Sequence, residues 1–291
     1  MAGAGMRDVK RRIKSVESTM QITKAMQLVA SSKLRRAKER VETARPYFNT
    51  LYETICAMAA GNTDKTNLYT RPREVRRRAY VVIAGDRGLA GGYNVNILRY
   101  AESQMDPETA LVIPVGKRAV DYFSRRSQYE TRVFQEYAAV ESIDLERSFE
   151  LARLLTELFR NGEADEVELV YTEFASMLSQ VPACRKILPL SFTAEELEGR
   201  STADTFGAAE FDPSIGDVMA RIVPQFVGGM IFGAISESFA SEQAARRTAM
   251  EAASDNAEEM IGSLSLAYNR ARQGAITQEI TEISSGFEAL R

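Results

Sequence analysis

The chain has 291 residues, a formal net charge of −3, two cysteines and no histidine. The absence of histidine excludes the usual serine and cysteine triads and histidine metal ligands, and the small net charge gives no sign of nucleic-acid binding. Cys56 and Cys184 lack metal-ligand spacing and lie in apolar stretches, so we expect free buried thiols in a reducing compartment.

The first predicted segment, residues 1–60, is a long coiled-coil helix that begins at about Arg7. The first six residues are a glycine-containing leader for which no structure is predicted. Apolar and small residues recur there at alternating steps of three and four, which is typical of a coiled-coil seam. Pro46 interrupts the helix, but the pattern continues past it, so we expect a kink near Arg45 and no stop. The seam comprises Val9, Ile13, Val16, Met20, Thr23, Gln27, Ala30, Leu34, Ala37, Val41, Ala44, Phe48, Leu51, Ile55 and Met58.

A polar linker over residues 61–78 leads into a predicted α/β domain at 79–194. Continuous apolar runs of strand length, each followed by an amphipathic stretch, predict parallel strands buried on both faces. We expect strands at 79–84 and 111–115 with helices at 93–105 and 117–126, then a short strand at 133–137, a helix at 144–161, and strands at 167–174 and 185–190 joined by a turn at Val181-Pro182. The domain is therefore predicted to be Rossmann-like and inserted between two helical arms.

A second linker, residues 195–215, precedes a C-terminal coiled-coil helix over residues 216–291. Its seam has two threads, one from Met250 to Ala275 and one from Ile276 to Leu290. Residues 7–45 hold 12 Lys or Arg against 4 Asp or Glu, whereas residues 237–291 hold 5 Arg against 9 Asp or Glu. Opposite charge favours an antiparallel pairing of the two arms within one chain.

Two further features of the arms bear on partners. The most apolar run, residues 222–235, is interrupted by Pro224, Gln225 and three glycines, so we expect no membrane span. A seam this rich in alanine leaves considerable apolar surface uncovered, including Ile22, Val29, Ile276 and Ile283, which predicts an enclosing partner.

A glycine-rich motif, Gly85 to Asn94, follows the first strand of the domain. Such glycines can cradle a phosphate at a helix N-terminus, or they can form a tight turn with positive φ angles. The spacing differs from the dinucleotide fingerprint, and no acidic ribose partner follows about 20 residues later, so we favour the turn. No group of residues assembles a nucleophile, a base and an oxyanion donor; we therefore predict a non-catalytic chain without cofactor or metal.

Four separated stretches resemble the γ subunit of F-type ATP synthases. They are Arg12 to Lys33, Asp86 to Asn94, Ala240 to Met250, and Tyr268 to Ile280. The likeness extends over the whole chain in order. It departs from the family at the end, where Gly286-Phe287 stands in place of the usual Gly-Ala, so we expect different packing of the last turn.

The resemblance implies a central rotor shaft inside a ring of α and β subunits, with the inserted domain near the ε subunit and the membrane c-ring. It places Lys24, Met26 and Arg246 near an acidic lever loop of β, and Gln273, Thr277 and Glu279 at a catch loop. Ion-driven rotation of the c-ring would turn the shaft and bias the nucleotide affinity of each β subunit; whether protons or sodium drive it depends on other subunits. The chain would be peripheral to the cytoplasmic face of a bacterial membrane.

Two other functions stay open from the residues alone. The first is a nucleotide-binding α/β enzyme whose helical arms dimerise it. The second is a coiled-coil scaffold that forms homodimers. For the rotor, we expect Met26→Lys to place a second cation beside Lys24 and to uncouple ATP hydrolysis from ion pumping.

Overall fold

The computed structural model describes residues 2–61, 67–71, 73–192 and 214–288, which form two compact units. One unit contains residues 1–31 and 246–291, and the other contains residues 32–245. Two long helices contribute to both units: α1, Ala2–Gly61, and α7, Ile215–Glu288.

The larger unit, residues 32–245, holds a five-stranded sheet in the order β3-β2-β1-β4-β5. The first four of these strands run parallel, and β5 pairs antiparallel with β4. The elements are β1 Arg78–Ile83, α2 Tyr93–Gln104, β2 Ala110–Val115, α3 Lys117–Phe123, β3 Glu130–Thr131, α4 Leu145–Arg160, β4 Glu166–Phe174 and β5 Gln180–Leu188, with single 3-10 turns η1 Gln135–Tyr137 and η2 Val140–Ser142. This is the predicted Rossmann-like α/β domain with its parallel strands.

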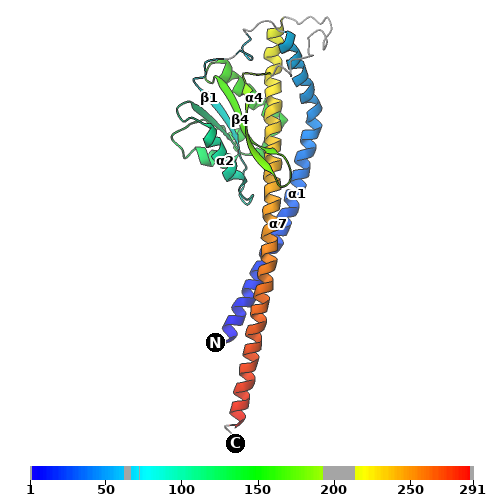
Figure 1. Cartoon of the computed structure of the whole chain (residues 1–291), viewed down its shortest axis with the longest axis vertical. Helices are drawn as coiled ribbons and strands as arrows, with labels where there is room; N and C mark the ends of the chain where they lie inside the picture. The colour runs from blue at the N-terminus through cyan, green and yellow to red at the C-terminus, as the bar shows by residue number, and fades with distance from the viewer. Residues whose placement is uncertain (1, 62–66, 72, 193–213, 289–291) are drawn as a thin grey trace. The chain divides into compact units, whose positions relative to one another are not determined.

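Side chains alternate between the two faces of the sheet, as strand geometry requires. Val81 and Ile83 of β1 lie in a core shared with α4, the end of α1 and the start of α7. Tyr80 and Val82 lie in a second core formed with α2 and α3. Helix α2 accordingly lies on the face of the sheet away from α7 (Figure 1).

Within this unit α1 and α7 run antiparallel. Tyr52 stacks on Phe226 with ring centroids 5.8 Å apart, and Tyr47 donates a hydrogen bond to Gln225 Oε1 at 3.0 Å. Further along, Leu34 and Ala37 of α1 share a small core with Ala240 and Ala244 of α7. Aromatic side chains thus fill one part of the contact and small residues the other.

In the smaller unit the first half of α1 lies beside α7 from about Arg246 onward (Figure 1). Thr23 Oγ1 and Ser254 Oγ are 2.7 Å apart in a buried contact, and Ala30, Met250 and Ala257 are buried as well. All fifteen residues of the predicted α1 seam are buried or half-buried. The seam prediction for α1 is therefore confirmed.

The seam of α7 extends less far than predicted. Burial along the first thread fades after Tyr268, and Ile276, Ile280 and Ile283 of the second thread are exposed. Helix α7 continues there beyond the N-terminal end of α1, which leaves no second helix for these residues to pack against (Figure 1). The side chains of Phe287 and Leu290 lie outside the described residues.

Other local predictions need correction. The expected strand at 133–137 is wrong: β3 lies at Glu130–Thr131, and η1 follows because Tyr137 turns inward to pack in the core while its carbonyl accepts from the Gly116 amide. The turn expected at Val181-Pro182 lies instead at residues 175–179, where Ser176 Oγ accepts from the amides of Leu178 and Ser179. Val181 and Pro182 belong to β5, an edge strand that tolerates proline.

The helices differ from prediction mainly at their ends. Helix α1 begins at Ala2 and so includes the leader, and it passes Pro46 without a stop. Neither cysteine forms a disulfide; Cys56 is buried as expected, whereas Cys184 is half-buried. The predicted linker at 195–215 lies almost wholly outside the described residues.

Helix α7 contains one 18-residue window that is long and apolar enough to cross a membrane by length and composition alone. Of this window, 56% is buried inside the structure, as in the core helix of a globular domain. More than half of this apolar window is therefore packed within the chain.

Candidate functional site

The first predicted contact group, Lys24, Met26 and Arg246, lies in the smaller unit. Lys24 is exposed, Met26 is half-buried, and Arg246 is buried at 8% exposure. The Thr23–Ser254 contact sets the antiparallel register, so Arg246 falls opposite residue 31 of α1, about 10 Å along the helix from Lys24. The three residues share one region of the helix pair but form no tight cluster.

Lys24 and Met26 point to opposite flanks of the helix contact. Each residue turns an α-helix by about 100°, so Lys24 and Met26 lie about 160° apart around α1, on either side of Thr23 and Ala30. Met26 shares its flank with Ile22 and Val29, which are 57% and 56% exposed. A lysine at position 26 would therefore enter an apolar flank, and the expectation of a second cation beside Lys24 is wrong.

The second predicted group, Gln273, Thr277 and Glu279, is exposed on the unpaired part of α7. The Thr277 hydroxyl donates to the Gln273 carbonyl at 2.9 Å, one turn earlier on the same side of the helix. On an ideal helix Glu279 lies about 120° from Gln273. Between them runs the stripe of Ile276, Ile280 and Ile283, so the polar residues form two edges of an apolar surface.

Exposed large apolar side chains with a polar rim are typical of protein-binding surfaces. On the smaller unit they include Ile22, Leu28, Val29, Met260, Leu266, Ile276, Ile280 and Ile283. Such an arrangement is suited to binding a partner.

The glycine-rich loop between β1 and α2 is a tight turn. Leu89 and Gly91 adopt positive φ angles of 62° and 55°, and the Gly85 amide donates to Asn94 Oδ1 at 2.9 Å. The Asp86 carboxylate accepts from the amides of Lys117, Val140 and Glu141 at 3.0–3.2 Å. The Tyr93 amide, at the start of α2, donates to the Ala90 carbonyl within the loop at 3.2 Å. These internal bonds and the positive φ angles favour the tight turn over a phosphate cradle.

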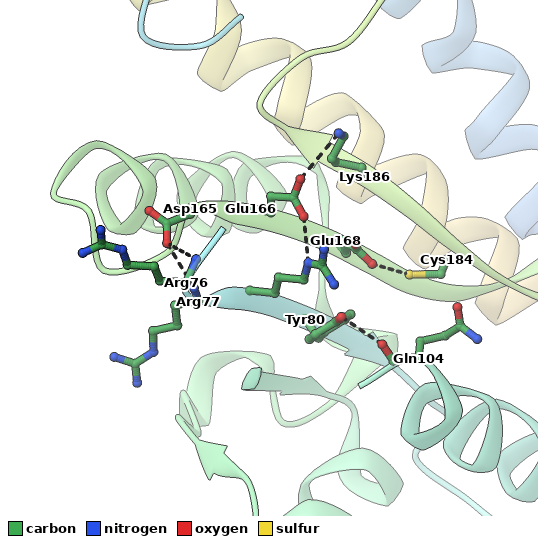
Figure 2. A network of polar contacts seen from close by, with 10 residues as sticks. Arg76, Arg77, Tyr80, Gln104, Asp165, Glu166, Glu168, Cys184 and Lys186 are labelled. Atoms are coloured by element: carbon green, nitrogen blue, oxygen red, sulfur yellow. Dashed lines mark hydrogen bonds and ion pairs between the residues drawn. The ribbon is translucent and has the colours of Figure 1, made fainter. Parts of the chain in front are cut away.

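Another concentration of ionisable groups is a polar network on β1, β4 and β5 (Figure 2). Glu166 pairs with Arg78 at 2.8 Å and with Lys186 at 3.6 Å, while the Cys184 thiol donates to Glu168 Oε2 at 2.8 Å. Burial, and then this hydrogen bond, raise the pKa of Cys184, so the thiol stays protonated. These groups satisfy one another, and the network is structural. Within the described residues no three His, Cys, Asp or Glu side chains are grouped as metal ligands.

Comparison with known proteins identifies the family. The family model described as ATP synthase matches residues 5–290. The ATP synthase gamma chain of Ruminococcus albus is 49% identical over 97% of both chains, and the sodium-ion-specific gamma chain of Acetobacterium woodii is 43% identical over 98% of both.

The chain belongs to the ATP synthase gamma-chain family. The resemblance predicted from the four motifs is therefore confirmed. Members of the gamma-chain family are non-catalytic subunits.

Solved structures agree on the gamma-chain fold. A chain of the Euglena gracilis mitochondrial ATP synthase, in an OSCP/F1/c-ring structure, superposes with a TM-score of 0.67 at 23% identity, covering 99% of this chain and 95% of that chain. A chain from the rotor of the same enzyme gives a TM-score of 0.65 at 20% identity, covering 94% and 99%. The long helices with an inserted α/β domain are thus a shared architecture.

Proposed function

We propose that this chain is the central rotor shaft of an F-type ATP synthase. Its partners are the α and β subunits of the catalytic head, the ε subunit and the membrane c-ring. The chain is peripheral, at the cytoplasmic face of a bacterial membrane. The observation that carries the proposal is the unpaired part of α7, which presents Ile276, Ile280 and Ile283 to solvent and needs an enclosing partner.

The helices, the α/β domain and the linkers have different roles in this proposal. Residues 1–60 and 216–291 form the shaft, residues 79–194 form the domain that meets ε and the c-ring, and residues 61–78 and 195–215 connect them. Ion flow turns the c-ring, and the domain passes this rotation to the helices.

The shaft acts on β by unequal binding. A shaft that binds all β conformations equally would shift none of them, so only an asymmetric surface can bias nucleotide affinity. Lys24 and Met26 lie on different flanks of the helix pair, and Glu279 lies on a different edge from Gln273 and Thr277. Each β subunit therefore meets a different surface as the shaft turns: Lys24, Met26 and Arg246 at one level, and Gln273, Thr277 and Glu279 at the other.

The test is co-expression of the tagged chain with α and β subunits from the same source. We expect a stable assembly that contains one copy of this chain and hydrolyses ATP. A variant with Ile276, Ile280 and Ile283 all changed to Asp should assemble poorly although the isolated chain keeps its circular dichroism, because these side chains are exposed. The matched control changes the same three residues to Leu and should assemble normally.

The opposite outcome is equally specific. A lone monomer that binds ATP in equilibrium dialysis and recovers no α or β would overturn the rotor proposal. The loop at Gly85 would then be the candidate nucleotide-binding site.

A further inference from the structure

The backbone of Thr172, in β4, is held by two serines of α7. The Thr172 amide donates to Ser238 Oγ at 3.1 Å, and Ser241 Oγ donates to the Thr172 carbonyl at 3.3 Å. Ser238, Ser241 and Thr172 are all at most 2% exposed. We name these three residues the serine clamp.

The sheet itself creates the need for this clamp. Thr172 is paired with Pro182 of β5, which has no amide hydrogen to donate. The amide and carbonyl of Thr172 point away from β5, toward the side on which β1 pairs with β4. The β1–β4 ladder has already ended there, at Val82 and Val170. Buried backbone groups must find partners. The hydroxyls of Ser238 and Ser241, one helical turn apart, form the two hydrogen bonds that a neighbouring strand would otherwise supply.

Close packing flanks the clamp on the same helix. A Cβ on Gly85 would lie 2.7 Å from Glu242 Cδ, and a Cβ on Gly228 would lie 2.2 Å from Phe149 Cδ1. Glycine therefore lets the β1–α2 loop approach α7 closely at one point, and lets α7 approach α4 at another. The domain meets α7 through three of its parts.

The clamp differs in kind from the surrounding apolar contacts. Hydrophobic packing is non-directional, whereas hydrogen bonds require a defined distance and angle. Two serines bonded to one residue's amide and carbonyl fix both the rotation of α7 about its axis and its position along that axis.

We propose that the serine clamp is the torque-transmitting joint between the α/β domain and the shaft. This inference rests on the proposed rotor function. Rotation that enters through the domain must reach α7 without slip, and the clamp is a directional contact that opposes slip. Ser238 and Ser241 are positioning residues and touch no nucleotide.

The test uses the complete ATP synthase in membrane vesicles, with Ser238 and Ser241 both changed to Ala. Alanine favours helix, so α7 should persist. We expect ATP hydrolysis within two-fold of the unmodified enzyme, and at least a two-fold loss of ions pumped per ATP when an opposing ion gradient loads the joint. Single-molecule rotation should show lower torsional stiffness.

Two controls separate the clamp from general damage. Thr172→Val removes a buried hydroxyl that has no hydrogen-bond partner and keeps both clamp bonds, so pumping per ATP should be unchanged. Ser103→Ala removes an exposed serine that bonds only to α2 and to neighbouring Gln104, and should also have no effect. If the double variant fails to assemble, Ser238→Ala and Ser241→Ala are tested singly, because each keeps one bond.

An assembled Ser238→Ala/Ser241→Ala enzyme with unchanged stiffness and unchanged pumping per ATP would overturn the clamp proposal alone. Failure of the unmodified chain to join α and β would instead overturn the rotor function. The two failures are therefore distinguishable.

Discussion

At the scale of single residues, Asp86 is the main anchor of the glycine-rich loop. One carboxylate joins three segments: the loop itself, the start of α3 through the Lys117 amide, and η2 through the amides of Val140 and Glu141. Hydrogen bonds to a charged acceptor contribute more than neutral ones. The loop thus keeps its shape without a bound ligand.

Asp86→Ala should lower the free energy of unfolding by about 2–3 kcal/mol, because three backbone donors lose a charged acceptor. Urea unfolding of the isolated chain measures this change. Asp121→Ala, at an exposed position on α3, is the control and should stay within about 0.5 kcal/mol. An equal effect of the two variants would contradict the anchoring role.

Glu237, on α7, is a second informative residue. Burial raises the pKa of its carboxyl, and nearby Glu173 of β4 raises it further. The Phe174 amide, Arg185 of β5 and Arg45 of α1 act in the opposite direction, and Tyr171 donates to Glu173 at 3.0 Å. The folded chain therefore holds the Glu237 proton more tightly than the unfolded chain does.

The sign of the pH dependence follows. Between the ordinary pKa of 4.5 and the raised pKa of the folded chain, the folded state binds more protons than the unfolded state. The free energy of unfolding therefore falls as the pH rises through this range, and it stays lower at higher pH. Glu237→Gln should raise the thermal midpoint at pH 7.5 and have less effect at pH 4.5. Glu157→Gln, exposed on α4, should show no such difference. A midpoint lowered at pH 7.5 in the Glu237 variant would show that the charged form stabilises the fold.

At the scale of elements, contact between α1 and α7 depends on small residues at defined points. A Cβ on Gly229 would lie 2.1 Å from Phe48 Cδ1, whereas a Cβ on Gly233, one turn later, would meet nothing within 4 Å. The Phe48 ring is also held by Phe232, with ring centroids 6.3 Å apart. Two glycines of one helix thus have different roles.

Gly229→Ala should destabilise the chain by about 1–3 kcal/mol through overpacking, although alanine favours helix. Gly233→Ala should stabilise it by up to about 1 kcal/mol. In a Phe48→Ala background the Gly229 change should lose its cost, and equilibrium unfolding of the four chains forms the cycle that measures this coupling. Additive effects would refute the contact.

Most elements could be predicted from periodicity, and the exceptions have physical causes. The apolar runs of β1 and β2 and the seam of α1 were visible because burial on fixed faces leaves a repeating pattern. The register of β5 was not, because Pro182 signals a turn when read locally and is tolerated only at the sheet edge. The unpaired end of α7 carries the same pattern as a paired helix, so the sequence predicted an enclosing partner but not the point at which pairing with α1 ends.

At the scale of the whole molecule, the surface for partners is distributed around the shaft. Met26 lies with Ile22 and Val29 on one flank of α1, and Lys24 lies on the other. The four motifs predicted the family, and with it the contact residues, which stay a prediction. Their angular separation needed the structure, because it depends on which side of α1 faces α7. The serine clamp had no sequence signal, since its need arises where a neighbouring strand ends.

Met26→Lys should reduce ions pumped per ATP hydrolysed at least two-fold in the assembled enzyme, because a cation would enter the apolar flank that we propose meets β. Met26→Leu is the conservative control and should pump normally. Measuring hydrolysis and pumping on the same vesicles gives the ratio directly. Normal pumping by the lysine variant would remove Met26 from the coupling surface.

The exposed stripe of Ile276, Ile280 and Ile283 has a consequence for how the protein is made. A newly synthesised copy carries this stripe into solution before any α or β subunit has covered it. Surplus copies would associate with themselves or be degraded. Production of this chain must therefore be matched to the supply of the subunits that enclose it.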